Sequence, residues 1–305
     1  MLKLISRRLI GMVPLLLIIV TITFFLLRKA PGSPFASEKG FKPQVIEALN
    51  RQYGLDKPLH IQYFNYLKGV VKGNLGPSTR YVGRSVNDII WEHLPNSLLL
   101  GFTAYFIALL VGLPLGIIAA VKQNSLVDYL SMATAMLGVS TPTFVLGPIM
   151  IILFSLTLYI LPPARWGEMR HLILPAVTLS VVYIAYIARL TRSGMLEVLG
   201  ADYIRTARAK GLSESAVVMR HALRGGILPV VSFTGPALAF LLSGTIVVER
   251  IFAVPGLGNI FIEAANSRDY FVVMGITLFI SIALIVMNLL VDIVLGLLDP
   301  RISYK

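Results

Sequence analysis

Long apolar runs separated by short polar segments dominate this chain of 305 residues. A helix needs about 20 mostly apolar residues to cross a bilayer, and six segments approach or exceed that length. We expect membrane-spanning helices at residues 9–27, 98–121, 143–161, 172–188, 226–248 and 271–298. The pattern therefore predicts an all-α polytopic membrane protein, with residues 1–305 forming a single transmembrane domain.

Two features inside the apolar runs predict how the helices bend and pack. The run Tyr129–Leu161 is longer than one span requires and contains Pro142, which cannot continue helical hydrogen bonding. We expect a kink there, with an interfacial or tilted first part and a spanning part from about Phe144. Gly112 and Gly116 lie four residues apart, a spacing that lets helix backbones approach closely.

The distribution of basic residues predicts the orientation, because Lys and Arg concentrate in cytoplasmic loops. With the N-terminus inside, residues 1–8, 122–128, 189–225 and 299–305 are cytoplasmic and hold most of the basic residues of the short loops. The short outer loops hold only Arg165, Arg170, Arg250 and Arg268. Both termini are therefore expected inside the cell.

The long segment of residues 28–97 is then extracytoplasmic. Apolar residues recur at helical spacing in Pro43–Leu55 and again in Leu59–Val71, and a turn sequence follows from Gly73 to Pro77. We expect a small helical cap on the outer face.

Composition supports a membrane protein and excludes several other classes. Hydrophobic residues make up 56% of the chain and charged residues 14%, against about 25% charged residues in soluble domains. The net charge of +12 lies between apolar runs rather than on a polar domain with stacking aromatics, which excludes nucleic acid as a partner. The chain contains no cysteine, and its four histidines are scattered, so no metal site is expected.

The sequence provides no energy source of its own. No Gly-Lys dipeptide occurs, so a nucleotide-binding Walker A loop is absent. Asp292, one helical turn after Asn288, is the one ionisable residue well inside a predicted span. These two residues either pack across helices or take part in gating. Proton- or ion-coupled carriers usually need several such charges, so a secondary carrier is disfavoured and a partner that supplies energy is indicated.

The polar, basic stretch Ala201–Arg224 interrupts two apolar runs. It can form a short helix that ends at Gly211 in a left-handed conformation, followed by a second helix N-capped by Ser213. Arg220 and Arg224 lie four residues apart, and two like charges there favour an external acidic or lipid partner.

This stretch resembles the cytoplasmic coupling loop of ABC-importer permeases, whose pattern is Glu-Ala-Ala, three residues, Gly, nine residues, Ile-x-Leu-Pro. Counting from Gly211 places Arg205-Thr206-Ala207 at the Glu-Ala-Ala positions, where they would form the part that contacts an ATPase. The expected coupling residues are Tyr203, Arg205, Thr206, Ala207, Arg208, Lys210, Gly211, Leu212, Ser213, His221 and Leu223. Only Ala207, Gly211 and Leu223 match the general pattern; the local form YIRTARAKGLSE is similar to the peptide and nickel branch.

Further fragments along the whole chain resemble the same branch, and within it the B-type permease subunit of oligopeptide importers. They are Ala30-Pro31-Gly32-Ser33-Pro34, Tyr53-Gly54-Leu55-Asp56-x-Pro58, Gly73-Asn74-Leu75-Gly76-x-Ser78, Ser140-x-Pro142-x-Phe144, Glu249-x-x-Phe252-x-x-Pro255-Gly256-Leu257-Gly258 and Asp299-Pro300-Arg301.

The resemblance implies a bacterial inner-membrane (plasma membrane) protein that pairs with a second homologous permease in contact with membrane lipid. Two cytoplasmic ATPases, which bind ATP and Mg, would dock on the coupling loop, so this chain would need no cofactor and would not be an enzyme. An extracytoplasmic peptide-binding protein would deliver oligopeptides and face Pro255, Gly256, Leu257 and Gly258. A nickel or other small-solute permease of the same branch is the alternative.

Overall fold

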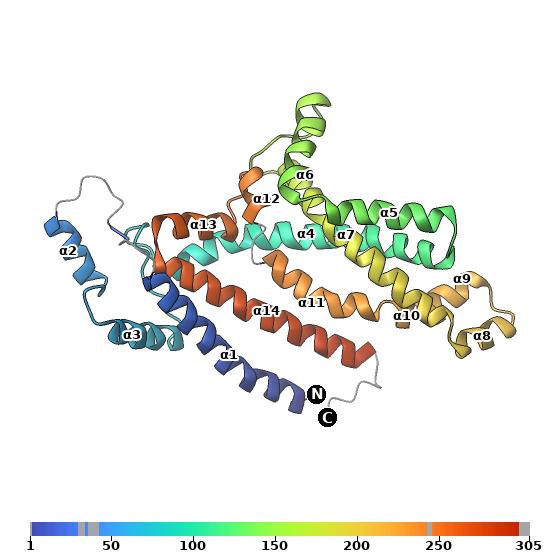
Figure 1. Cartoon of the computed structure of the whole chain (residues 1–305), viewed down its shortest axis with the longest axis horizontal. Helices are drawn as coiled ribbons and strands as arrows, with labels where there is room; N and C mark the ends of the chain where they lie inside the picture. The colour runs from blue at the N-terminus through green and yellow to red at the C-terminus, as the bar shows by residue number, and fades with distance from the viewer. Residues whose placement is uncertain (1, 30–33, 36–42, 243–245, 299–305) are drawn as a thin grey trace.

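The computed structural model describes residues 2–29, 34–35, 43–242 and 246–298, which form helices joined by short connections (Figure 1). The long helices are α1 (Leu2–Lys29), α4 (Val86–Val121), α5 (Leu126–Ser140), α7 (Met169–Leu199), α11 (Leu228–Leu242) and α14 (Tyr270–Leu298). The shorter ones are α2 (Pro43–Gln52), α3 (Leu59–Val71), α6 (Thr143–Met150), α8 (Asp202–Ala209), α9 (Glu214–Ala216), α10 (Leu223–Gly226), α12 (Ile246–Ile251) and α13 (Leu257–Ser267). Two π-helical turns, η1 (Ile151–Thr157) and η2 (Val217–Ala222), continue α6 and α9. Residues 30–33, 243–245 and 299–305, which include parts of the predicted loops and of the fifth span, lie outside the described residues.

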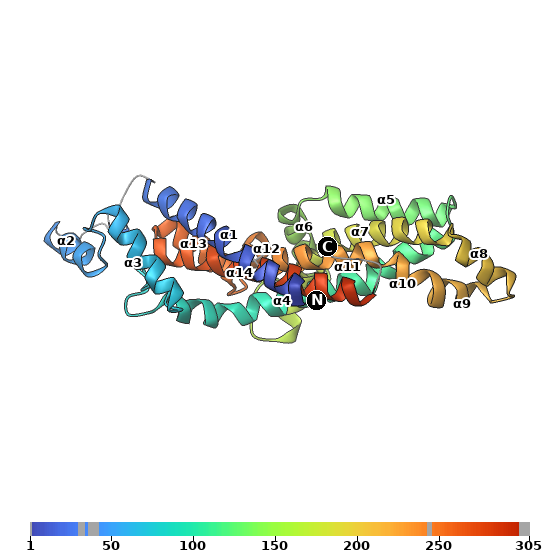
Figure 2. The same cartoon turned by 90° about the horizontal axis from the view of Figure 1, so that it is seen from below.

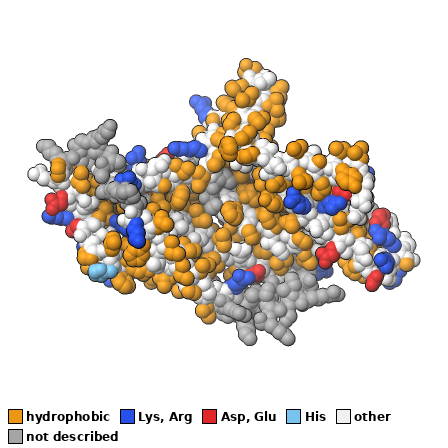
Figure 3. All heavy atoms as spheres, in the orientation of Figure 1, with side chains coloured by type: hydrophobic (Ala, Val, Ile, Leu, Met, Phe, Trp, Pro, Cys, Tyr) orange, Lys and Arg blue, Asp and Glu red, His pale blue; other side chains and the backbone are white. Residues whose placement is uncertain are grey.

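Four helices are individually long and apolar enough to cross a membrane: α1, α4, α7 and α14. Two bent pairs also qualify, α5 with α6 and η1, and the segment Glu214–Gly226 with α11, which gives up to six spans in the described residues. Hydrophobic side chains cover the middle of the molecule, whereas charged side chains gather toward the end that carries α8 and α9 and toward the opposite end (Figure 3). The expected polytopic helical fold is confirmed.

The helices continue beyond the predicted spans. α4 begins twelve residues before the predicted span, at a capping box in which the Ser85 side chain and Asp88 satisfy each other's backbone N–H groups. α7 continues to Leu199, well into the segment expected to be loop. Apolarity marks the part of a helix suited to hydrocarbon, whereas backbone hydrogen bonding continues into polar sequence, so the two boundaries differ.

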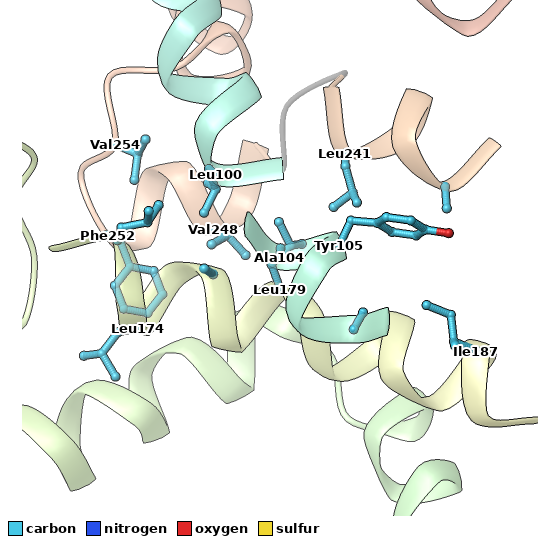
Figure 4. Close-up of a cluster of buried hydrophobic side chains, with 14 of the residues drawn as sticks. Leu100, Ala104, Tyr105, Leu174, Leu179, Ile187, Leu241, Val248, Phe252 and Val254 are labelled. Atoms are coloured by element: carbon cyan, nitrogen blue, oxygen red, sulfur yellow. The ribbon is translucent and has the colours of Figure 1, made fainter. Parts of the chain in front are cut away.

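The core lies where α4 and α7 pack along their lengths, with α11 and α12 against them (Figures 1 and 4). Gly112 and Gly116 face α7 so closely that a side chain at Gly116 would come within 2.5 Å of the Ala188 carbonyl oxygen. The close approach expected from their spacing is confirmed. Within this core the Tyr105 hydroxyl is 2.6 Å from the Thr234 hydroxyl on α11, which satisfies both polar groups.

The predicted break at Pro142 is confirmed. α5 and the α6–η1 segment meet at 102°. α5 packs along α7 and α4, with Gly138 against Val181, whereas α6 contacts α7 and α12 and leads into η1, which projects from the bundle (Figure 1). Figure 2 shows α5 beside α7 from a second side. Both parts therefore contact the bundle, with Gly147 of α6 against Ile251 and Phe252, and the spanning part from about Phe144 stays a prediction. Small residues on α5 allow this packing, because they let the α7 backbone come close.

The predicted outer cap is helical as expected. α3 lies against α1 and the start of α14, with Tyr66, Phe24 and Tyr270 buried between them. The turn that follows uses positive φ angles at Gly73 and Gly76, which glycine adopts without steric cost. The cap is thus packed onto the helices that reach the outer end of the bundle.

Candidate functional site

The stretch Ala201–Arg224 folds as two short helical segments around Gly211. α8 ends at Ala209 with Lys210 as its C-cap, and Gly211 follows with φ 79°. Ser213 begins the next segment, its hydroxyl accepting a hydrogen bond from the Ala216 N–H, and α9 continues through η2 into α10. The predicted break and the predicted N-cap are both confirmed.

One face of the stretch Ala201–Arg224, the predicted coupling loop, packs onto α7. Ile204 is fully buried and Ala207 is 5% exposed, in a cluster with Met195, Val217 and Ala222. Ala207 therefore does not lie on an exposed contact face with Arg205 and Thr206, as the sequence pattern implied. An amphipathic helix turns its apolar face toward the hydrophobic core, and Ala207 lies on that face with Ile204.

An ion pair closes the turn at Gly211. The Arg208 guanidinium donates to both oxygens of Glu214, through Nε at 3.0 Å and Nη2 at 2.6 Å. The hydrogen bond from Arg208 lowers the pKa of the Glu214 carboxyl and raises the pKa of the Arg208 guanidinium. Arg208 thus holds the two halves of the loop together.

The opposite face of the coupling loop is exposed. Tyr203 is 52% exposed and Leu212 is 41% exposed. The other exposed coupling residues are Arg205, Thr206, Arg208, Lys210, Gly211, Ser213 and His221, and Leu223 is partly buried. An apolar groove runs beside this face, between Ile118 and Val121 of α4 and Val218 and Met219 of η2. The exposed face therefore combines an aromatic ring, basic groups and apolar surface.

One close contact fixes the segment that follows the coupling loop to α7, and one ion pair fixes α5 to α7. Gly194 of α7 lies so close to Gly226 that a side chain there would come within 2.3 Å of the Gly226 carbonyl oxygen. Slightly earlier on α7, Arg192 donates through Nε and Nη2 to both oxygens of Asp128 on α5, at 2.6 and 2.7 Å. The Asp128 side chain is 2% exposed. A buried, bidentate pair of this kind defines one position of α5 relative to α7.

The turn expected to face a binding protein is largely internal. Gly256, Leu257 and Gly258 are buried, and Pro255 is partly buried. Its backbone surrounds the Glu249 carboxylate, which is 0% exposed and accepts hydrogen bonds from the Ser97 hydroxyl and the Asn259 N–H. A side chain at Gly256 would come within 2.4 Å of that carboxylate. The glycines serve this internal contact, which corrects the expectation that these residues themselves present an outer surface.

The predicted gating residues contact neighbouring helices. Asn288 lies against Gly235 of α11 and donates to the Leu284 carbonyl oxygen. Asp292 forms an ion pair with Arg8 of α1 at 2.6 Å. The pair joins the first and last long helices near the ends where α1 begins and α14 ends.

Sequence reasoning missed the partners of these groups. Arg8 and Arg192 were included only among the basic residues of the cytoplasmic segments, Asp128 was given no role, and Glu249 was part of a motif only. The spacing between Glu249 and Gly256 was the available signal for a carboxylate enclosed by a turn. Among the described residues, no group of three or more His, Asp or Glu side chains is arranged to hold a metal ion.

An apolar helical bundle with a folded, partly exposed basic loop at one end defines a multi-pass membrane protein built to meet a partner. The chain belongs to the family described as "Binding-protein-dependent transport system inner membrane component", whose model matches residues 112–304; the N-terminal model of such membrane components matches residues 1–100. The resemblance to ABC-importer permeases of the peptide branch is thereby confirmed, as is the expected location in the bacterial inner membrane.

Relatives match over the full chain. The chain is 43% identical over 306 residues to the oligopeptide transport system permease protein OppB of Haemophilus influenzae, covering 100% of both. It is 46% identical over 297 residues to the dipeptide transport system permease protein DppB of Bacillus subtilis, covering 97% of this chain and 96% of the relative. An inward-facing structure of the MetNI methionine ABC transporter has the same fold, with a TM-score of 0.56 and 18% identity over 69% of this chain and 96% of that one.

Proposed function

We propose that this chain forms one half of the membrane pathway of an ATP-driven importer for oligopeptides, beside a second, homologous permease. The observation that carries this proposal is the full-length similarity, at 43% identity or more, to permeases of oligopeptide and dipeptide transport systems. The similarity covers 100% of this chain and of the oligopeptide permease, and 97% of this chain and 96% of the dipeptide permease.

ATP and Mg would be bound by two partner ATPases rather than by this chain, which lacks a Walker A loop. The exposed face of the coupling loop supports a docking role, because Tyr203 and Leu212 leave aromatic and apolar surface uncovered beside basic groups. Large exposed apolar side chains rimmed by charge are typical of protein interfaces. The buried face of α8 and η2 would carry the movement into α7.

An extracytoplasmic peptide-binding protein would meet the opposite end. Since Gly256, Leu257 and Gly258 are enclosed around Glu249, the surface offered to it would come from the outer cap and the exposed parts of α13. The enclosed turn would then set the position of α13 rather than touch the binding protein.

Co-purification followed by an ATPase assay tests the proposal. The chain is expected to purify with a second permease and two ATPases, and peptide loaded on the binding protein should stimulate ATP hydrolysis. Peptide uptake by the chain alone, driven by a proton gradient, would contradict it.

A further inference from the structure

A cavity of about 210 Å³ lies in the outer cap, between the end of α1, helix α3, the turn at Gly76 and the start of α14. Its polar lining is contributed by Arg28, Tyr53, Gln62, Asn65, Tyr66 and Asn74. This space would hold several water molecules at about 30 Å³ each. It is separate from the coupling loop and from the enclosed turn at Gly256.

Three buried polar atoms around this cavity have no hydrogen-bond partner among the described residues: the Tyr66 hydroxyl, Arg28 Nε and Gln62 Oε1. Tyr66 is only 5% exposed, and burial raises the pKa of its hydroxyl, so the group is a protonated donor at neutral pH. Buried polar groups are nearly always paired, so three together indicate a ligand that supplies the missing partners.

The charge of Arg28 also lacks a counter-ion. Its guanidinium lies over the rings of Tyr270 and Phe24, at 4.8 and 5.4 Å from the ring centroids. No carboxylate of the described residues forms an ion pair with it. Ring faces attract a cation but do not satisfy its N–H groups, and a partly buried guanidinium without an anion is costly.

The walls of the cavity are fixed by close backbone contacts. A side chain at Gly69 would come within 2.8 Å of the Asn74 carbonyl oxygen, and one at Gly76 would come equally close to the Phe271 ring. The Gln62 amide nitrogen donates to the carbonyl oxygens of Leu55 and Lys57, so its oxygen is the atom left to accept. The polar atoms are therefore held in place before a ligand arrives.

We infer that this cavity is a subsite for the free C-terminal carboxylate of a short peptide. The Arg28 guanidinium and the Tyr66 hydroxyl donate to the carboxylate, the pairing for which a guanidinium fork is best suited. Gln62 Oε1 accepts from a peptide N–H, which a simple carboxylate does not have. The inference rests on the proposed peptide cargo and adds a chemical determinant, a free C-terminus.

Calorimetric titration of the chain in nanodiscs of zwitterionic lipid tests the subsite with three probes: tri-alanine, tri-alanine amide and acetate. Tri-alanine should bind, whereas the amide and acetate should bind at least roughly tenfold more weakly, because a charged hydrogen bond is lost in one and the N–H contact in the other. Arg28→Gln should weaken tri-alanine binding by roughly tenfold or more, and Tyr66→Phe by severalfold. Arg80→Gln is the matched control, because Arg80 is an exposed arginine of the same cap that does not line the cavity.

Absence of tri-alanine binding overturns the inference, as does equal binding of the acid and the amide. Acetate that binds as tightly as tri-alanine overturns the assignment to a peptide. If Arg28→Gln does not fold, the Tyr66→Phe variant and the tri-alanine amide still test the inference, because Tyr66→Phe keeps the buried ring. The ATPases are absent from this assay, so a failure of the subsite and a failure of ATP-driven transport are observed separately.

Discussion

At the scale of single residues, several glycines of this chain are explained by what lies beside them. Gly256 has ordinary backbone angles, and the reason for a glycine is the Glu249 carboxylate beside it. Gly211 is the reverse case: its φ is positive, and a side chain there would meet nothing within 4 Å. The first position is constrained by packing and the second by backbone conformation.

The contact between Gly256 and Glu249 predicts a non-additive pair of substitutions. Glu249→Ala removes the acceptor for Ser97 and the Asn259 N–H and should cost about 3 kcal/mol. Gly256→Ala should also destabilise, because its methyl group meets the carboxylate. The double variant should be more stable than the sum of the two costs implies, since removal of the carboxylate makes room for the methyl group. Thermal unfolding in detergent measures all three; strict additivity would contradict the contact, and Gly11→Ala, with open space around it, is the control.

Gly211 predicts a loss of coupling without a loss of folding. An L-residue there costs about 1 kcal/mol in backbone strain, and a bulky side chain projects outward. Gly211→Trp should therefore insert normally but abolish most peptide-stimulated ATP hydrolysis in the assembled transporter. Gly83→Trp is the matched control, because Gly83 also has a positive φ (81°) and open space around it, but lies on the outer cap. Normal stimulation in Gly211→Trp, or equal loss in both variants, would count against the coupling role.

At the scale of elements, buried ion pairs and close glycines determine how the helices are arranged. Pro142 ends α5. The packing of α5 against α7 depends on Gly138 and on the ion pair between Asp128 and Arg192. The coupling loop is likewise held by the pair between Arg208 and Glu214. Each pair joins segments whose relative position local sequence does not specify.

The pair between Asp128 and Arg192 predicts a large effect of a single substitution. Arg192→Ala leaves a buried carboxylate unpaired and should destabilise the chain by about 3–5 kcal/mol. Arg189→Ala, at an exposed arginine one turn earlier on α7, should change stability by less than about 1 kcal/mol. Thermal unfolding in detergent compares the two, and similar melting temperatures would show that the pair does not hold α5.

The pair between Arg208 and Glu214 predicts pH dependence in the coupling loop. Since the folded pKa of Glu214 is lowered, the pair stabilises the turn above the ordinary glutamate pKa of about 4.3 and is lost as pH falls through the lower folded value. A spin label at Leu212→Cys should therefore be restrained at neutral pH and become mobile well below pH 4. With Glu214→Gln the label should be mobile throughout. A label equally restrained in both proteins would exclude the pair as the restraint.

At the scale of the whole molecule, polar groups collect at two ends separated by apolar surface (Figure 3). The outer cap lies at one end and the coupling loop at the other (Figure 1). The start of α1 and the end of α14 are joined by the pair between Arg8 and Asp292. This arrangement supports a two-sided orientation in which a delivering partner and an energy-supplying partner act from opposite sides.

Accessibility labelling tests that orientation, and the native chain contains no cysteine to interfere. A membrane-impermeant maleimide should label Val82→Cys, on the exposed outer turn, in intact cells. Ser213→Cys should be labelled only after the membrane is permeabilised. The opposite pattern would invert the orientation argued here.

The sequence by itself determined the helical elements and several local details. The length of the apolar runs predicted the long helices, and helical spacing of apolar residues predicted the cap. Residue chemistry predicted the break at Pro142, the left-handed Gly211 and the N-cap at Ser213. These features depend on side chains and backbone angles within one or two helical turns. Local sequence therefore suffices to predict these features without knowledge of the tertiary structure.

Only the tertiary structure decided which residues meet. It placed α5 along α7, enclosed Glu249 in the turn that contains Gly256, and left Arg28 facing a cavity. Such contacts join positions far apart in the chain. Their partners are selected by the packing of the whole bundle, because burying a charge is tolerated only where the fold supplies its counterpart.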